Sequence, residues 1–142
     1  MRLIYLDASV LVPLFRVEPR TSHVNQLLLE AEVDFLVSDF ASGEFGATMA
    51  RLVRTLEIGS KDAADRLAKF DDWLSAVCET VSTESRDVQN ASLLVRRFEL
   101  QLRLPDAIHI ALARRTGSRL VTADKRLFDA CEKIDCNALL IS

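Results

Sequence analysis

The sequence predicts an α/β/α sandwich in which a mainly parallel sheet of about five strands lies between layers of helices. Short apolar runs alternate with longer segments of helical period, as the crossover connections of a parallel sheet require. Hydrophobic residues make up 49% of the 142 residues, which is enough for a buried core. No repeat, low-complexity tract or flexible linker interrupts this pattern, so we expect a single domain over residues 1–142.

The first half of the chain predicts two strands, each followed by helices. Thr21 or Ser22 can cap a helix, and Gly59 ends another directly before Ser60, which can cap the next. The expected elements are, in chain order, a strand at 3–6, a helical turn at 9–15, a helix through 24–31, a strand at 34–38, a helix at about 39–56 and a helix from residue 60 with Leu67, Phe70, Trp73 and Leu74 on one face.

The second half predicts three more strands. Pro105 favours the first turn of a helix, where its missing N–H has no cost, and Gly117 favours the end of that helix. The expected elements are, in chain order, a weak strand at 77–82, a helix through 88–98, a helix at 105–116, a strand at 118–124, a short helix at 125–133 and a last strand at 136–142.

The composition argues against several classes of protein. No apolar run approaches the roughly 20 residues of a membrane helix, and no signal-peptide pattern opens the chain, so we expect a cytoplasmic protein. The cysteines, Cys78, Cys131 and Cys136, are odd in number and lack paired spacing. They therefore argue against a disulfide framework or a zinc site, and we expect ordinary buried thiols.

Four carboxylates interrupt or adjoin the apolar framework. Asp7 and Asp124 each follow a predicted strand, and Glu44 and Asp106 each lie in the opening turns of a predicted helix. In a parallel sheet the ends of strands and the starts of crossover helices meet at the carboxyl edge, where open α/β sheets bind ligands. The four acids should therefore converge on one edge of the sheet.

Each acid also has a simple structural explanation as a helix cap or as a favourable charge in a first helical turn. Four carboxylates at one edge are harder to explain in this way, because they repel one another unless one protonates or a cation neutralises them. Mg²⁺ and Mn²⁺ prefer carboxylate and water oxygens. The pattern therefore indicates that Asp7 is a metal ligand.

Three stretches carry a resemblance to a known family: "LDASVLV" near the start, "VSDFASGEF" in the middle, and "LPDAIHIALA" followed by "RLVTADKRLF" near the end. In this order they resemble the PIN-domain nucleases, and among them the VapC-type toxins of prokaryotic toxin–antitoxin pairs. The resemblance covers essentially the whole chain. It implies a parallel sheet between helices, and a metal-dependent endoribonuclease whose partner is a VapB-like antitoxin.

The resemblance also implies roles for individual residues. Asp7, Glu44, Asp106 and Asp124 become the catalytic acids that bind Mg²⁺ or Mn²⁺. Ser9 and Thr122 become hydroxyls that hold these ligands or metal-bound water, and Asp129 is a possible fifth acid. A metal lowers the pKa of water and stabilises charge on a phosphodiester, so water can attack in line and leave a 5′-phosphate without a protein nucleophile.

Basic residues supply candidates for substrate binding. Nine basic side chains against four acidic ones fall within residues 86–126, although the formal net charge of the chain is −3. This asymmetry is typical of a surface that faces a polyanion, but arginines on solvated helix faces explain it as well. Lys125 and Arg126, directly after Asp124, are the first candidates for binding RNA phosphates. Arginines between residues 86 and 103 come next.

The two histidines are weaker candidates. His109 could act as a general base, but its apolar neighbours Ile108 and Ile110 favour a packed, structural histidine. His23 lies in a helix of surface type.

Other functions fit less well. A receiver-type phosphoacceptor domain would carry a second acid beside the first strand and a lysine–proline pair at the last strand, and neither is present. A haloacid-dehalogenase-like phosphatase would have Asp-x-Asp where this chain has Asp7-Ala8-Ser9. A catalytically silent PIN scaffold that binds RNA or a protein partner remains the alternative.

The helices between about residues 41 and 77 carry many large apolar side chains. We expect some of them to line a homodimer contact or an antitoxin groove, with burial in the core as the alternative. The candidates are Phe45, Leu52, Leu56, Phe70 and Trp73.

Overall fold

The computed structural model describes residues 2–15 and 33–141, and its centre is a sheet of five strands. All four strand pairings are parallel, in the order β3-β2-β1-β4-β5. The prediction of a mainly parallel, five-stranded α/β fold is therefore confirmed. The strands are β1 (Arg2–Leu6), β2 (Val33–Ser38), β3 (Glu79–Val81), β4 (Arg119–Thr122) and β5 (Ala138–Leu140).

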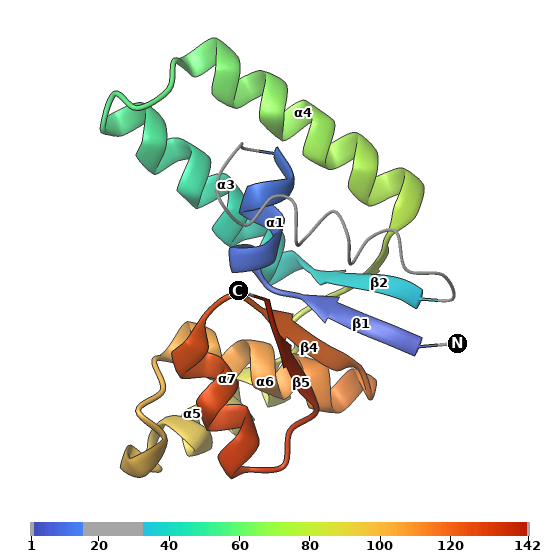
Figure 1. The fold of residues 1–142 in the computed structure, drawn as a ribbon, viewed down its shortest axis with the longest axis vertical. Coiled ribbons are helices and arrows are strands. Elements are labelled where there is room, and N and C mark those ends of the chain that lie inside the picture. The colour runs from blue at the N-terminus through green and yellow to red at the C-terminus, as the bar shows by residue number, and fades with distance from the viewer. Residues whose placement is uncertain (1, 16–32, 142) are drawn as a thin grey trace.

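Helices cover both faces of the sheet, as Figure 1 shows. One core, against α1, α3 and α4, includes Leu6, Val37 and Phe45, and the other, against α5, α6 and α7, includes Tyr5, Leu36 and Leu120. None of the helices in the described ranges is long and apolar enough to cross a membrane. The helical elements are α1 (Ala8–Phe15), α3 (Asp39–Arg54), α4 (Ser60–Val77), α5 (Ser85–Val95), the 3₁₀ turn η1 (Phe98–Leu100), α6 (Leu104–Thr116) and α7 (Lys125–Lys133).

Local chemistry sets several element boundaries close to the predicted ones. The Ser38 hydroxyl accepts from the N–H of Ala41 at 2.9 Å and so caps α3. Gly117 ends α6 at φ 65°, in the left-handed region that glycine tolerates. The helix expected through 98 is shorter, because α5 ends at Val95 and a separate 3₁₀ turn precedes Gln101 at φ 54°. The helix expected at 24–31 and His23 lie outside the described residues.

Most of the apolar side chains expected at an interface belong to the core instead. Phe45, Leu52 and Phe70 are buried, and Phe45 stacks on Phe70 with ring centroids 4.3 Å apart. For these three the expectation of an interface is wrong, because α3 and α4 pack their apolar stripes against α1 and against each other. Leu56 is 91% exposed, and Trp73 is half-buried against this core, so an interface through these two stays a prediction.

The three thiols differ in burial more than the sequence predicted. Cys131 is buried in α7, whereas Cys78 and Cys136 are half-buried, and none of the three forms a disulfide. Burial raises the pKa of Cys78 to about 12. A hydrogen bond with Cys131 lowers the pKa of Cys136 to about 7, with Arg114 nearby contributing in the same direction. Cys136 is therefore the more acidic thiol of the three.

Candidate functional site

The four acids predicted from the sequence lie at the carboxyl edge of the sheet, and we call them the acidic rim. The chain runs outward from β1 to β2 and β3, and then returns to the other side of β1 with β4. Ligands of open α/β sheets bind at such a switch point. Asp7 and Asp124 follow β1 and β4, the two strands at the switch point, and Glu44 and Asp106 stand in the first turns of α3 and α6.

Asp7 is the most firmly held of the four. The Ser9 hydroxyl donates to Oδ1 at 2.5 Å, and the Thr122 hydroxyl donates to Oδ2 at 2.6 Å. These hydroxyls also accept backbone N–H groups from the turn after β4, Ser9 from Ala123 and Thr122 from Asp124. The two side chains thus connect the ends of β1 and β4 through the Asp7 carboxylate.

Burial makes the charged form of Asp7 unfavourable. The residue is 4% exposed, and its polar contacts are neutral hydroxyls rather than an ion pair. Desolvation raises the pKa of Asp7 above its ordinary value, although nearby His109 and the two hydroxyls act in the opposite direction. A cation placed beside this carboxylate would relieve that cost.

Glu44 belongs to a chain of buried hydrogen bonds. His109 Nε2 lies 2.5 Å from Glu44 Oε1, and its Nδ1 lies 2.6 Å from the Tyr5 hydroxyl. The Tyr5 hydroxyl is in turn 2.8 Å from Ser38 Oγ. Because Ser38 accepts from Ala41, its own proton can go to Tyr5, the Tyr5 proton to Nδ1, and Nε2–H then donates to Glu44. His109 therefore holds the Glu44 carboxylate in place.

Asp106 and Asp124 share one cation, Arg103. The Arg103 N–H and Nε donate to Asp106 Oδ2 at 3.2 and 3.3 Å, and Nη2 lies 3.8 Å from Asp124 Oδ2. Asp124 also caps α7, because its Oδ1 accepts from the N–H of Arg126 at 2.9 Å. The capping explanation considered for Asp124 is therefore correct for one of its oxygens, while the other faces Arg103.

The other predicted contributors lie farther from these contacts. Lys125 pairs with Asp129 at 3.0 Å on the exposed surface of α7, so each has the other as its partner. The Arg126 side chain is exposed. Binding of substrate by Lys125 and Arg126, and a role of Asp129 as a fifth acid, stay predictions.

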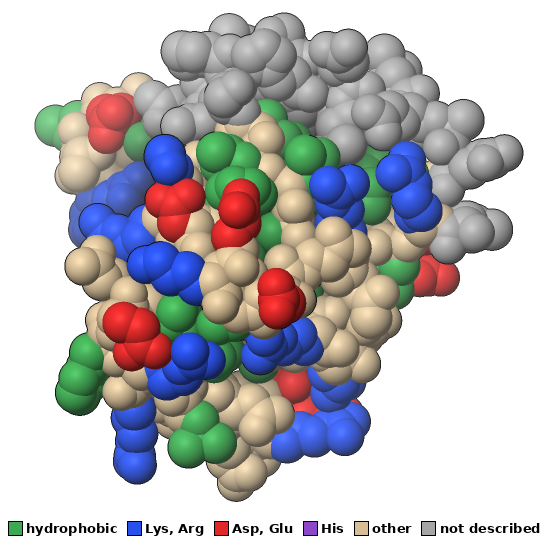
Figure 2. All heavy atoms as spheres, turned by 60° about the horizontal axis from the view of Figure 1, so that its bottom comes forward, with side chains coloured by type: hydrophobic (Ala, Val, Ile, Leu, Met, Phe, Trp, Pro, Cys, Tyr) green, Lys and Arg blue, Asp and Glu red, His purple; other side chains and the backbone are tan. Residues whose placement is uncertain are grey.

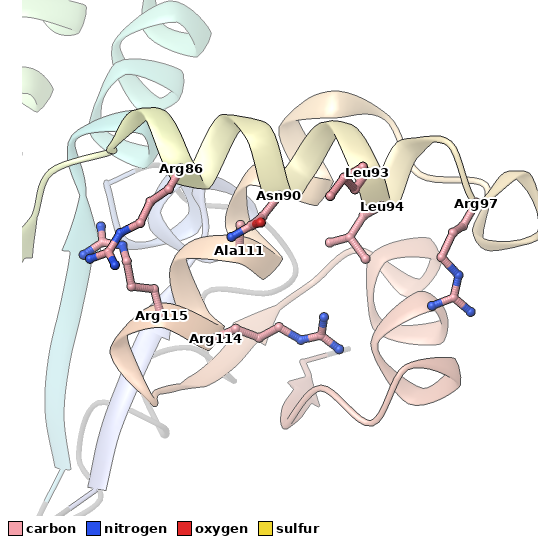
Figure 3. Close-up of a pocket in the computed structure, with 8 residues that line it drawn as sticks. All are labelled: Arg86, Asn90, Leu93, Leu94, Arg97, Ala111, Arg114 and Arg115. Atoms are coloured by element: carbon pink, nitrogen blue, oxygen red, sulfur yellow. The ribbon is translucent and has the colours of Figure 1, made fainter.

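The arginines of α5 and α6 form a separate groove, which we call the arginine groove (Figure 3). Its volume is about 510 Å³, and it is lined by Arg86, Asn90, Leu93, Leu94, Arg97, Ala111, Arg114 and Arg115. Arg115 is 2.9 Å from Asp87, Arg97 is 3.0 Å from Glu99, and Arg86 is paired with Glu84. Figure 2 likewise shows basic and acidic side chains interspersed on one face. Much of the basic charge in 86–126 is therefore neutralised locally.

A divalent metal suits the donor chemistry of the rim. All four side chains offer carboxylate oxygens, the ligands that Mg²⁺ and Mn²⁺ prefer. Asp7 in particular is buried without a charged partner at hydrogen-bonding distance. In the described parts of the chain, no three His, Cys, Asp or Glu side chains lie close enough together to hold one ion. The rim thus fits a hard cation in chemistry and in place, while its present partners keep the carboxylates from closing around one.

Comparison with known families decides the classification. The profile of the PIN domain matches residues 4–133, which include all four acids of the rim. The chain belongs to the PIN-domain family. A search among curated proteins found no significant match.

Solved structures show the same fold at low sequence identity. The PIN domain is similar to VapC20 of Mycobacterium tuberculosis, described as a toxin that cleaves the sarcin–ricin loop, with a TM-score of 0.71, 22% identity, and 89% of this chain and 94% of that chain covered. VapBC2 of Rickettsia felis, bound to a promoter DNA fragment, gives 0.66 and 18% over 89% and 91%. FitAcB of Neisseria gonorrhoeae gives 0.68 and 17% over 96% and 96%.

Two contacts of the rim were missed by the sequence analysis. His109 was expected to be only a packed histidine, and it is 3% exposed, but it also bonds Glu44. Arg103 was not singled out, although it contacts two of the acids. Residues 103, 106 and 109 are three apart, and side chains at this spacing share one helix face. That spacing was the available signal.

Proposed function

We propose that this PIN domain is a Mg²⁺- or Mn²⁺-dependent endoribonuclease that acts as the toxin of a toxin–antitoxin pair. The observation that carries the proposal is the acidic rim at the switch point of the sheet. Its central member, Asp7, is buried with hydroxyl partners and a raised pKa, which favours an incoming cation. A bound divalent ion would supply charge neutralisation at the phosphodiester and lower the pKa of an attacking water.

Each residue of the rim has a task in this reaction. Asp7, Glu44, Asp106 and Asp124 would hold the metal. Ser9 and Thr122 fix the orientation of the Asp7 carboxylate through their hydroxyl protons, and His109 fixes that of Glu44. Lys125 and Arg126 would bind RNA phosphates at the start of α7. Such contacts position a strand without reading its bases.

A partner protein is part of the proposal. The neighbours from Rickettsia felis and Klebsiella pneumoniae are described as a VapBC pair and as a toxin–antitoxin complex, and by analogy we propose a VapB-like antitoxin for this chain. We also propose a homodimer, with exposed Leu56 as a residue to examine at its surface. A short reading frame for a small DNA-binding protein beside the gene would support this assignment.

The direct test is cleavage of a single-stranded or structured RNA by the purified protein. We expect cleavage with Mg²⁺ or Mn²⁺ and none with EDTA, and Asp106→Asn should lower the rate roughly a hundredfold. Glu132→Gln, on α7 with an exposed side chain, serves as the matched control and should leave the rate unchanged. RNA binding without metal-dependent cleavage would favour the silent scaffold instead. Full activity of Asp106→Asn would remove that residue from the site.

A further inference from the structure

Arg103 occupies an unusual position, since it is a mobile cation placed among acids proposed to hold a metal. It immediately precedes α6, and its side chain is 66% exposed although it contacts Asp106, whose side chain is only 7% exposed. The hydrogen bond to Asp106 and the charges of Asp106, Asp124 and Glu44 raise the pKa of Arg103. The guanidinium therefore interacts electrostatically with three of the four rim acids.

The contacts of Arg103 use oxygens that a metal would need. Its Nε lies 3.3 Å from Asp106 Oδ2, and its Nη2 lies 3.8 Å from Asp124 Oδ2. The other oxygen of Asp124 already caps α7. A divalent ion that takes Asp106 and Asp124 as ligands must therefore take the place of the guanidinium, since two cations in one position would repel each other.

The geometry also allows the exchange. The contacts that bind Arg103 to the rim are long, at 3.3 and 3.8 Å, and the side chain is largely in solvent, so the guanidinium can swing away without disturbing the core. Once displaced it stays beside the rim, because its backbone is fixed at the start of α6 by the N–H bond to Asp106. A free guanidinium at that place can bind a phosphate group with two parallel hydrogen bonds.

We propose that Arg103 is the exchangeable counter-ion of the acidic rim: it neutralises Asp106 and Asp124 without metal, yields them to a divalent ion, and then binds a phosphate of the RNA. The last step rests on the proposed ribonuclease function, whereas the first two concern metal binding alone. Arg103 thus opposes metal loading and favours substrate binding.

Metal affinity tests the exchange without any cleavage assay. Free Mn²⁺ is measured by electron paramagnetic resonance in titrations of the parent, Arg103→Gln and Arg97→Gln, the last an exposed arginine paired with Glu99 in the arginine groove. We expect Arg103→Gln to bind Mn²⁺ about tenfold more tightly, since the competing charge is gone, and Arg97→Gln to match the parent. Equal or weaker binding by Arg103→Gln, or no binding by any of the proteins, would overturn the exchange.

Steady-state cleavage of an RNA oligonucleotide at saturating Mn²⁺ tests the phosphate contact. We expect Arg103→Gln to raise KM about tenfold with a smaller change in kcat, and Arg103→Lys to recover part of the loss, because lysine keeps the charge without the planar fork. An unchanged KM would overturn this step. Tighter Mn²⁺ binding by Arg103→Gln in a parent that cleaves no RNA would reject the ribonuclease and leave the exchange supported.

Discussion

Two buried aspartates on opposite sides of the molecule have opposite electrostatics. Asp7 is 4% exposed and Asp87 is 1% exposed. Asp87 accepts from the Arg115 guanidinium at 2.9 Å and from the N–H of Glu84 at 2.8 Å. Although desolvation acts against it, the bond to Arg115 lowers the pKa of Asp87, whereas burial raises the pKa of Asp7.

The difference separates a structural carboxylate from one available for binding. Asp87 has its cation built into the chain, and its pair with Arg115 joins α5 to α6. The partners of Asp7 are hydroxyls, which orient the carboxylate but leave its charge uncompensated. Burying a charge without a partner is costly, so such a group is retained where a cation arrives from outside. Burial alone would not distinguish the two residues, but their partners do.

The largest effect should come from the charge of Asp7 in catalysis. We expect Asp7→Asn to lower the RNA cleavage rate roughly a hundredfold or more, because the amide cannot serve as an anionic metal ligand. Asp87→Asn should cleave at the parent rate per folded molecule. Initial rates in Mn²⁺, normalised to the folded fraction from circular dichroism, make the comparison. Equal losses in both variants would mean that the two aspartates do not differ in function.

Asp87 should have the larger effect on stability. Asp87→Asn removes a charged acceptor of Arg115 from a buried site, and we expect a loss of about 2 kcal/mol in the free energy of unfolding. Arg115 keeps a second partner in Glu84 at 3.4 Å, which limits the loss. Urea unfolding in EDTA measures it, with Asp7→Asn as the matched control that should lose little or nothing. A stable Asp87→Asn protein would show that the pair is dispensable.

The same contrast explains what the sequence could and could not predict. The ends of strands and starts of helices placed Asp7, Glu44, Asp106 and Asp124 on one edge, because parallel crossover topology leaves little choice. The partners depend on side-chain packing across the sheet. Tyr5 meets His109 over a sequence separation of 104 residues, and no local pattern encodes that contact.

Apolar side chains were predicted less well than charged ones. A stripe of large residues on a helix predicts burial, but it does not say whether the chain itself or a partner covers the stripe. For Phe45, Leu52 and Phe70 the chain itself does, since α1 brings Phe15 against this cluster. Leu56, at φ 62° just after α3, is left at the surface.

His109 should have an intermediate effect through Glu44. We expect His109→Asn, which cannot place a donor where Nε2 lies, to lower kcat about tenfold. His109→Gln, whose longer side chain places an amide N–H near that position, should recover most of the loss. Tyr5→Phe tests the rest of the chain of bonds and should cost less, since it leaves the Nε2 bond intact. Equal losses in the Asn and Gln variants would point to packing rather than to positioning of Glu44.

The smallest effect should appear in the pH dependence of stability without metal. A carboxyl whose pKa is raised in the folded state binds protons more readily when folded, so stability rises as the pH falls from neutral through that raised pKa. Asp87 and Asp39, with lowered pKa values, have the opposite dependence, and their contribution is lost only below the ordinary aspartate range. In EDTA, the melting temperature of the parent should therefore increase by a few degrees between neutral pH and the ordinary aspartate range, and then fall under more acidic conditions. Asp7→Asn should lack the increase and be at least as stable as the parent at neutral pH, while Asp87→Asn should keep it. An increase of equal size in Asp7→Asn would assign the dependence to another group and remove the electrostatic distinction between the two aspartates.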